Sequence, residues 1–204
     1  GEGLDLAAPG VGLHVAGFHE ETGDPAIAQA TGTSFSAPIV SGMLATLMSL
    51  DGNQQTGDDY VQTLQAFANE THAPGADPFT GEGIADLGRA LRDGEPGLYD
   101  IALAGHYLDG ATSTRLGARL EVTVENRGTE TIDEALLRVT IGGRSTDFPL
   151  YTIEPGAIAT ETVLLDATRA GADGALVVES AVVARGITDA RPDNNARVTL
   201  FRID

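Results

Sequence analysis

The alternation of apolar and polar positions divides the chain into two parts. Up to about residue 93 the pattern is mostly helical, and from residue 99 on it is that of strands only. The longest apolar run, Ser34–Leu50, has no charged residue and places apolar side chains on nearly every side of a helical wheel. Because a helix that is apolar all round must be buried all round, the sequence predicts a fully buried helix here.

Shorter elements are expected around this helix. Two are strands and two are helices: Leu4–Ala8, Val11–Phe18, Asp58–Thr71 and Ile84–Leu91. Thr33 is placed to cap the start of the long helix through its hydroxyl, and Pro38 lies close enough to that start to be tolerated. So few elements cannot enclose a helix that is apolar on every side. We therefore expect that part of a larger domain is missing from this chain.

The second part of the chain shows the period of two that is typical of half-buried strands. Leu120, Val122 and Val124 are expected to point inward, with Glu121, Thr123 and Glu125 pointing outward. Seven strands are predicted, at Asp100–Leu108, Leu116–Asn126, Leu137–Ile141, Thr146–Tyr151, Ala157–Leu165, Ala175–Val183 and Arg197–Ile203. Seven short strands separated by Gly, Pro and Asn turns favour an all-β, immunoglobulin-like sandwich.

Charge supports the same division. The 204 residues include 30 acidic and 12 basic side chains, all of the latter arginine, and the net charge is -18. Residues 1–96 hold 14 acids and 2 arginines, whereas residues 97–204 hold 16 acids and 10 arginines. The change coincides with the turn-rich stretch Asp93–Gly97. We predict a multidomain chain, with one domain at 1–96 and a second at 97–204.

Composition also excludes several classes of function. The absence of cysteine excludes disulfides and thiolate metal sites, and an acidic surface disfavours nucleic acid. Pro38, Gly42 and several serines interrupt the apolar run, so no membrane span is expected. No signal-peptide pattern opens the chain, and we expect the natural N-terminus to lie upstream. Acidity without lysine points to a salt-rich habitat.

The stretch Gly32-Thr33-Ser34-Phe35-Ser36-Ala37-Pro38 is the one that carries chemistry. A serine at the N-terminus of a buried helix lies where unpaired N–H groups and the helix dipole favour negative charge. Its own N–H can help to hold the oxyanion of a tetrahedral intermediate. The alternative is that Thr33 and Ser34 only cap a core helix, although a cap does not require the whole seven-residue pattern.

This stretch resembles the nucleophile motif of the subtilisin-like serine peptidases. Two flanking segments agree: Asp5–Val11 is similar to the family's strand that ends in Ala-Pro-Gly, and Gly81–Asp86 to its Gly-x-Gly segment before the last helix. The resemblance implies that residues 1–93 are the C-terminal portion of an α/β catalytic domain. It makes Ser34 the nucleophile, with support for the motif from Gly32, Thr33 and Pro38.

In this family the catalytic aspartate and histidine precede the serine. His14-Val15-Ala16-Gly17 looks like part of the family's histidine motif, but the position that matches its catalytic histidine is Val11. We therefore assign His14 to a strand or loop, and His19 and His72 to solvated loops or helix ends. The Asp, the His and the oxyanion Asn are expected from upstream residues or a partner chain, so this chain alone is predicted to be inactive.

The turns of the second part resemble those of CARDB domains, which are adhesion-related domains of bacteria and archaea. The similar turns are Asn126-Arg127-Gly128, Glu154-Pro155-Gly156 and Asp193-Asn194-Asn195. Together with Asp189, the last of these offers oxygen ligands for calcium, but such a run more often forms a turn that bonds its own backbone. No other cofactor is expected. Asn69-Glu70-Thr71 fits a glycosylation acceptor, a tripeptide that is common by chance.

Together these features predict the C-terminal portion of a secreted or cell-surface prokaryotic serine endopeptidase, followed by an accessory sandwich. Its substrate would be a peptide or protein, and its partner the upstream half of the peptidase domain. The competing hypothesis is a non-catalytic adhesion or binding module, in which the protease-derived part serves only as a scaffold.

Overall fold

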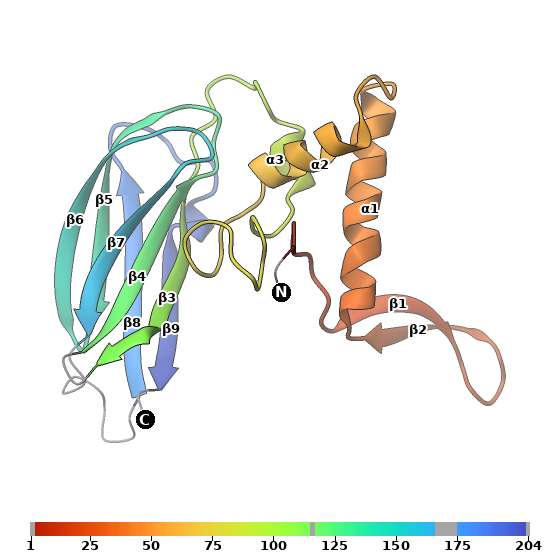
Figure 1. The fold of residues 1–204 in the computed structure, drawn as a ribbon, viewed down its shortest axis with the longest axis horizontal. Helices are drawn as coiled ribbons and strands as arrows, with labels where there is room; N and C mark the ends of the chain where they lie inside the picture. The colour runs from red at the N-terminus through yellow and green to blue at the C-terminus, as the bar shows by residue number, and fades with distance from the viewer. Residues whose placement is uncertain (1–2, 115–116, 166–174, 203–204) are drawn as a thin grey trace.

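The computed structural model of the chain describes residues 3–114, 117–165 and 175–202. Figure 1 shows a helical N-terminal part beside a β-sheet C-terminal part. The N-terminal part contains β1 (Leu13–Phe18), β2 (Pro25–Ala30), α1 (Thr33–Leu50), α2 (Gly57–Ala66) and α3 (Leu87–Ala90). β1 and β2 form an antiparallel hairpin that extends away from the rest of the molecule at the start of α1.

The described residues of the C-terminal part form seven strands in two antiparallel sheets. The strands are β3 (Ile101–Thr114), β4 (Gly117–Asn126), β5 (Ile132–Ile141), β6 (Arg144–Ile153), β7 (Ile158–Leu165), β8 (Ala175–Ala184) and β9 (Ala196–Arg202). One sheet has the order β3-β4-β7 and the other the order β6-β5-β8-β9, and a short 3₁₀ turn at Pro192–Asn194 precedes β9. The seven predicted strands are confirmed; the predicted ends at Leu116 and Ile203 lie outside the described residues.

The two sheets share one hydrophobic core. Leu120, Val122 and Val124 of β4 are fully buried in it, as the alternation predicted, and Leu137 of β5 and Val178 of β8 come from the other sheet. Full burial of one such side chain contributes about 1.5–3 kcal/mol. The C-terminal part is thus a sandwich that covers its own apolar faces.

The N-terminal part has a much smaller core, in which Leu47 of α1 packs with Tyr60 and Leu64 of α2 and with Ala90. Leu47 is the one buried residue of α1. The prediction of a long helix is therefore confirmed, whereas the prediction that it is buried all round is wrong within this chain. The physical reason is that α2 and its neighbours cover one side of α1, and no described element covers the others.

By length and composition alone, α1 also passes the test for a helix that could cross a membrane, with a mean hydropathy of 1.3. Core helices pass the same test, so the expectation of no membrane span stays a prediction.

Several boundaries in the N-terminal part differ from those predicted. α2 ends at Ala66 instead of Thr71 because the chain then pairs with a distant segment: the Asn69 N–H donates to the Ile84 carbonyl (2.8 Å), and the Ile84 N–H to the Asn69 carbonyl (2.9 Å). Ile84 is therefore extended, and α3 begins only at Leu87, after Asp86 caps it. The predicted strand Leu4–Ala8 is reduced to single bridges at its third and fourth residues.

Candidate nucleophile turn and the junction between the two parts

Ser34 lies in the first turn of α1, and its side chain is exposed. The turn before it is tied to the preceding Ala-Pro-Gly segment, because the Gly32 N–H donates to the Gly10 carbonyl (2.7 Å). Ser36 adds a second tie through its hydroxyl, which donates to the Pro9 carbonyl (3.2 Å). The nucleophile motif and the Ala-Pro-Gly motif, separate in the sequence, are thus brought together at the start of the helix.

Close backbone approach explains the glycine at position 10. A Cβ atom there would overlap the Ser36 hydroxyl and would lie 3.1 Å from the Gly32 carbonyl oxygen. Any larger residue would therefore push the helix start away from the segment that holds it.

The third predicted motif, Gly81-Glu82-Gly83, packs against the same N-terminal segment. The Ala7 N–H donates to the Gly83 carbonyl and the Ala85 N–H donates to the Ala7 carbonyl, both at 2.9 Å. Gly81 and Gly83 have φ of 65° and 125°, and a Cβ on either would collide with the backbone of Asp5 or Asn69. Only glycine fits these two positions without strain.

At the start of α1, backbone N–H groups and the Ser34 hydroxyl are available to bind a ligand. Its N-cap is Gly32, with no side-chain cap, so the prediction that the Thr33 hydroxyl caps the helix is wrong: Thr33 is already the first helical residue. The first-turn N–H groups of a helix have no intrahelical acceptor, and they create a positive potential at Ser34. Pro38 also has no N–H with which to reach the Ser34 carbonyl. Within the described residues, the Ser34 hydroxyl has no hydrogen-bond partner.

None of the chain's four histidines is hydrogen-bonded to Ser34, and all four lie in the described residues. His14 is exposed on β1, opposite Gln29, and His19 lies in the turn between β1 and β2, as expected. His72 lies in a loop, half-exposed, with its ring against Phe79 and Tyr107 at centroid distances of 4.7 and 5.1 Å. A base for Ser34 is therefore not visible in the described part of the chain.

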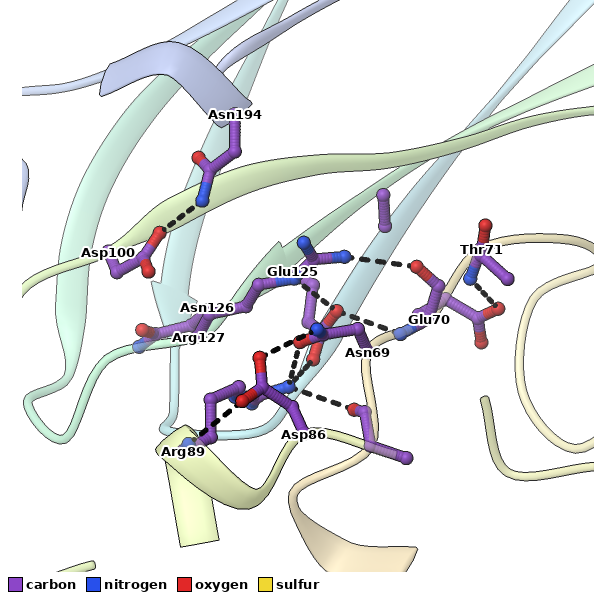
Figure 2. A network of polar contacts seen from close by, with 12 residues as sticks. Asn69, Glu70, Thr71, Asp86, Arg89, Asp100, Glu125, Asn126, Arg127 and Asn194 are labelled. Carbon is purple, nitrogen blue, oxygen red and sulfur yellow. Dashed lines mark hydrogen bonds and ion pairs between the residues drawn. The ribbon is translucent and has the colours of Figure 1, made fainter. Parts of the chain in front are cut away.

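A buried polar network joins the two parts of the chain, and Figure 2 shows it. Its centre is Glu125 at the end of β4, whose side chain is only 2% exposed. One carboxylate oxygen accepts a hydrogen bond from Arg89 of α3 (2.5 Å), and the other accepts from Arg127 (2.9 Å) and from the Glu70 N–H (3.0 Å). The outward direction predicted for Glu125 is correct for the sandwich, but this outward face is covered by the N-terminal part.

Asn69 and Asp86 extend this network within the N-terminal part. The Asn69 amide donates to Asp86 (2.9 Å) and its oxygen accepts from Arg89 (2.9 Å). The side chain of the asparagine that fits a glycosylation acceptor is thus already engaged through both its nitrogen and its oxygen. Burial opposes ionisation of Asp86, yet the hydrogen bonds from Asn69 and from the Arg89 N–H, together with nearby arginines, lower its pKa. Burial raises the pKa of Glu70, although its carboxylate accepts bonds from the N–H groups of its own loop.

The candidate calcium residues form a turn. Asp189 accepts bonds from the Ile101 N–H (3.0 Å), the Arg191 N–H (2.7 Å) and the Asn195 amide (3.2 Å), and the Asn194 amide donates to Asp100 (2.8 Å). The described residues contain no group of three acidic or histidine side chains arranged to hold a metal ion. This geometry favours the turn interpretation, and Asp193 lies in the 3₁₀ turn.

Comparison with known families matches residues 2–86 to the subtilase family, Peptidase_S8. The matched range contains all three motifs described above, including Ser34, and so confirms that the N-terminal part resembles the subtilisin-like serine peptidases. No curated protein matches the chain.

Two solved domains are similar to part of the chain. One is the CARDB domain of a Pyrococcus furiosus protein, solved in complex with di-metal ions, with 18% identity, a TM-score of 0.37 and coverage of 43% of this chain and 73% of that one. The other belongs to a protein of Methanosarcina acetivorans described as a cell surface protein, with 14% identity, a TM-score of 0.42 and coverage of 52% and 91%.

Proposed function

We propose that residues 1–93 are the C-terminal portion of the catalytic domain of a secreted subtilisin-like serine endopeptidase, with Ser34 as its nucleophile. The observation that carries this proposal is the family match over residues 2–86, within which Ser34 lies exposed at the start of α1. The Asp, His and oxyanion Asn would come from residues upstream or from a partner chain. That missing half would also cover the apolar faces of α1.

In this proposal the Ser34 Oγ attacks the carbonyl carbon of a peptide bond while an external histidine takes its proton. The Ser34 N–H and the potential at the start of α1 stabilise the oxyanion of the tetrahedral intermediate. The C–N bond then breaks, and the histidine returns the proton to the leaving amine. Water hydrolyses the resulting ester in the same manner and restores the Ser34 hydroxyl.

The sandwich would serve as an accessory adhesion or binding domain on a prokaryotic cell surface or on the secreted enzyme. The competing function is a non-catalytic adhesion or binding module in which the protease-derived part serves only as a scaffold.

Peptidase activity tests the proposal directly. We expect no turnover of a casein-type substrate by the 204-residue chain, because without a base the serine hydroxyl stays protonated and is a poor nucleophile. The product of the whole encoding gene should be active and should react with a fluorophosphonate. Ser34→Ala should abolish both signals, whereas Ser41→Ala, further along α1, should leave them unchanged.

Two outcomes would contradict this assignment. Activity of the 204-residue chain that Ser34→Ala abolishes would show that the base lies within this chain. A gene product with no upstream Asp and His, and with no fluorophosphonate labelling, would support the scaffold function instead.

A further inference from the structure

Arg197 of β9 differs from the other described arginines in how it is paired. The buried or half-buried Arg89 and Arg127 both contact the Glu125 carboxylate, and the arginines without an ion pair elsewhere in the described residues are exposed. Arg197 is half-buried, and among the described residues no carboxylate lies within ion-pair distance of it. Shielding a charge from water without a partner is costly, so this side chain is the strongest candidate for an anion partner.

Among the described residues, the Arg197 guanidinium has one protein acceptor, the carbonyl of Ala104. A register shift between Leu103 and Gly105 places Ala104 at a bulge in β3, where the regular pairing with β4 is interrupted. The remaining N–H groups of Arg197 have no acceptor in the described residues. The carbonyl at the bulge thus holds one part of the guanidinium, and the other donors are available to a ligand.

Arg197 lines a pocket of about 320 Å³ between the two parts of the chain. The N-terminal part contributes Thr71 and Ile84 to its wall, and the sandwich contributes Leu103, Arg127 and Ala196. Glu70 also lines it, but its carboxylate accepts bonds from the Thr71 N–H and the Gly75 N–H, both at 2.7 Å. Glu70 is therefore engaged with its own loop, and it does not pair with Arg197.

We propose that this junction pocket binds a small organic monocarboxylate, with Arg197 as the charge partner. One unpaired guanidinium balances one negative charge, and its planar pair of donors matches the two oxygens of a carboxylate. The apolar side chains of Ile84 and Ala196 would contact the organic remainder of the ligand. A phosphate would bring a second charge close to Glu70 in a chain of net charge -18, and is disfavoured.

Electrostatics agrees with this geometry. The pKa of Arg197 is lowered, first by burial and second by the charge of Arg127. A bound carboxylate would relieve both effects. The proposal makes no use of Ser34 and does not depend on the peptidase assignment.

The test measures binding to the 204-residue chain by calorimetry, with N-acetyl-leucine as the probe and N-acetyl-leucinamide as the uncharged control. We expect the acid to bind and the amide not to bind. Arg197→Gln should weaken binding of the acid by about tenfold or more, the loss expected for a charged hydrogen bond. Arg202→Gln removes the same charge from an exposed position of the same strand and should have no effect.

A second variant and two further probes complete the binding experiment. Arg197→Lys keeps the charge but loses the paired donors, and it should bind the acid more weakly than the natural chain does; it also serves if Arg197→Gln fails to fold. A peptide that ends in leucine shows whether peptide C-termini are one source of the carboxylate. The proposal is overturned if the natural chain does not bind the acid, if the amide binds equally, if inorganic phosphate at equal ionic strength competes as well as the acid, or if neither Arg197 variant loses affinity.

Discussion

The two parts of this chain use similar amounts of apolar sequence with opposite results. In the sandwich, Leu137 and Val178 are completely buried because each sheet covers the inner face of the other. In the N-terminal part, Val11 and Ile27 are each 80% exposed. Both lie in the segment that precedes Ser34, where no described element covers them. An apolar pattern therefore predicts which face of a helix or strand needs to be shielded from water. It does not predict whether another element of the same chain provides the shielding.

The junction between the two parts differs from both the buried apolar core of the sandwich and the exposed apolar residues of the N-terminal part. It is polar and buried, with Arg89 on one side and Glu125 on the other. The turn-rich stretch at the predicted boundary is also hydrogen-bonded to the sandwich. The Gly97 N–H donates to Glu130 (2.7 Å), and the Thr129 N–H donates to the carbonyl of Leu98, the residue that follows Gly97 (2.8 Å). The division at residues 96 and 97 stays a prediction, and we expect the two sides to be coupled in stability.

Glu125→Ala should give the largest effect and would break that coupling. It leaves the buried guanidinium of Arg89 without its carboxylate partner, and the loss of a buried charge partner costs about 3–5 kcal/mol. Urea unfolding measures the change. Asp147→Ala, which breaks the exposed pair with Arg138, is the matched control and should be far milder. Equal effects of the two variants would show that the junction network does not hold the parts together.

A second prediction contrasts the cores themselves. Leu137→Ala in the sandwich should cost about 2–5 kcal/mol, because it leaves a cavity in a fully packed site. Leu50→Ala at the end of α1, where the side chain is 68% exposed, should change stability by no more than about 0.5 kcal/mol. The same unfolding measurement serves both. A large cost at Leu50 would mean that the exposed side of α1 is packed in solution, for example against a second copy.

Where local pattern and tertiary packing agree, the sequence was sufficient to predict the structure. The sandwich strands were predictable because residues such as Leu120 and Val122 alternate with polar ones and are buried by a partner sheet of the same chain. β2 was missed because Pro-Ala-Ile-Ala-Gln-Ala has neither clear alternation nor strong strand propensity. It is a strand because β1 pairs with it, and that is a tertiary cause.

The same distinction applies to the candidate site. The motif around Ser34 could be recognised through its resemblance to a family pattern, whereas the role of Ser34 stays a prediction. The close backbone contacts at Gly10 and Gly83 explain why glycine stands at those two positions. The junction was not predictable: Glu125 has the position of an ordinary solvent-facing residue, and its partner Arg89 lies 36 residues away in the other part. The change from a helical to a strand pattern predicted a boundary between two parts, but it did not identify the residues that connect them.

A third prediction concerns pH and should separate the sandwich from the rest. Burial, with a smaller contribution from the charge of Arg197, lowers the pKa of His106 to about 4. Its ring nitrogens lie 2.8 Å from the Thr199 hydroxyl and 2.9 Å from the Ser180 hydroxyl, between the two sheets. Because the unfolded state binds the proton more readily, stability should be lost as pH falls from about 6.5 toward about 4.

Urea unfolding across this range, compared between variants, tests the assignment to His106. His106→Gln should lose less stability than the natural chain between pH 6.5 and 4. His14→Gln removes an exposed histidine of β1 and should follow the natural chain. Identical slopes for all three proteins would show that the titration of His106 does not affect folding.

The smallest effect we predict is that of salt, and it depends directly on the difference in charge between the two parts. Self-repulsion opposes compaction and is screened over about 10 Å at about 0.1 M ionic strength. Residues 1–96 have a net charge of -12 and residues 97–204 one of -6, so molar salt should stabilise the first part more. Addition of the upstream half should stabilise it further, because that half would cover α1.

Hydrogen exchange at Ile39–Leu47 and at Leu120–Val124, at low and high salt, measures both regions at once. Equal and strong protection of both at low salt, with no partner present, would show that the N-terminal part is complete by itself, and would favour the scaffold function over the peptidase.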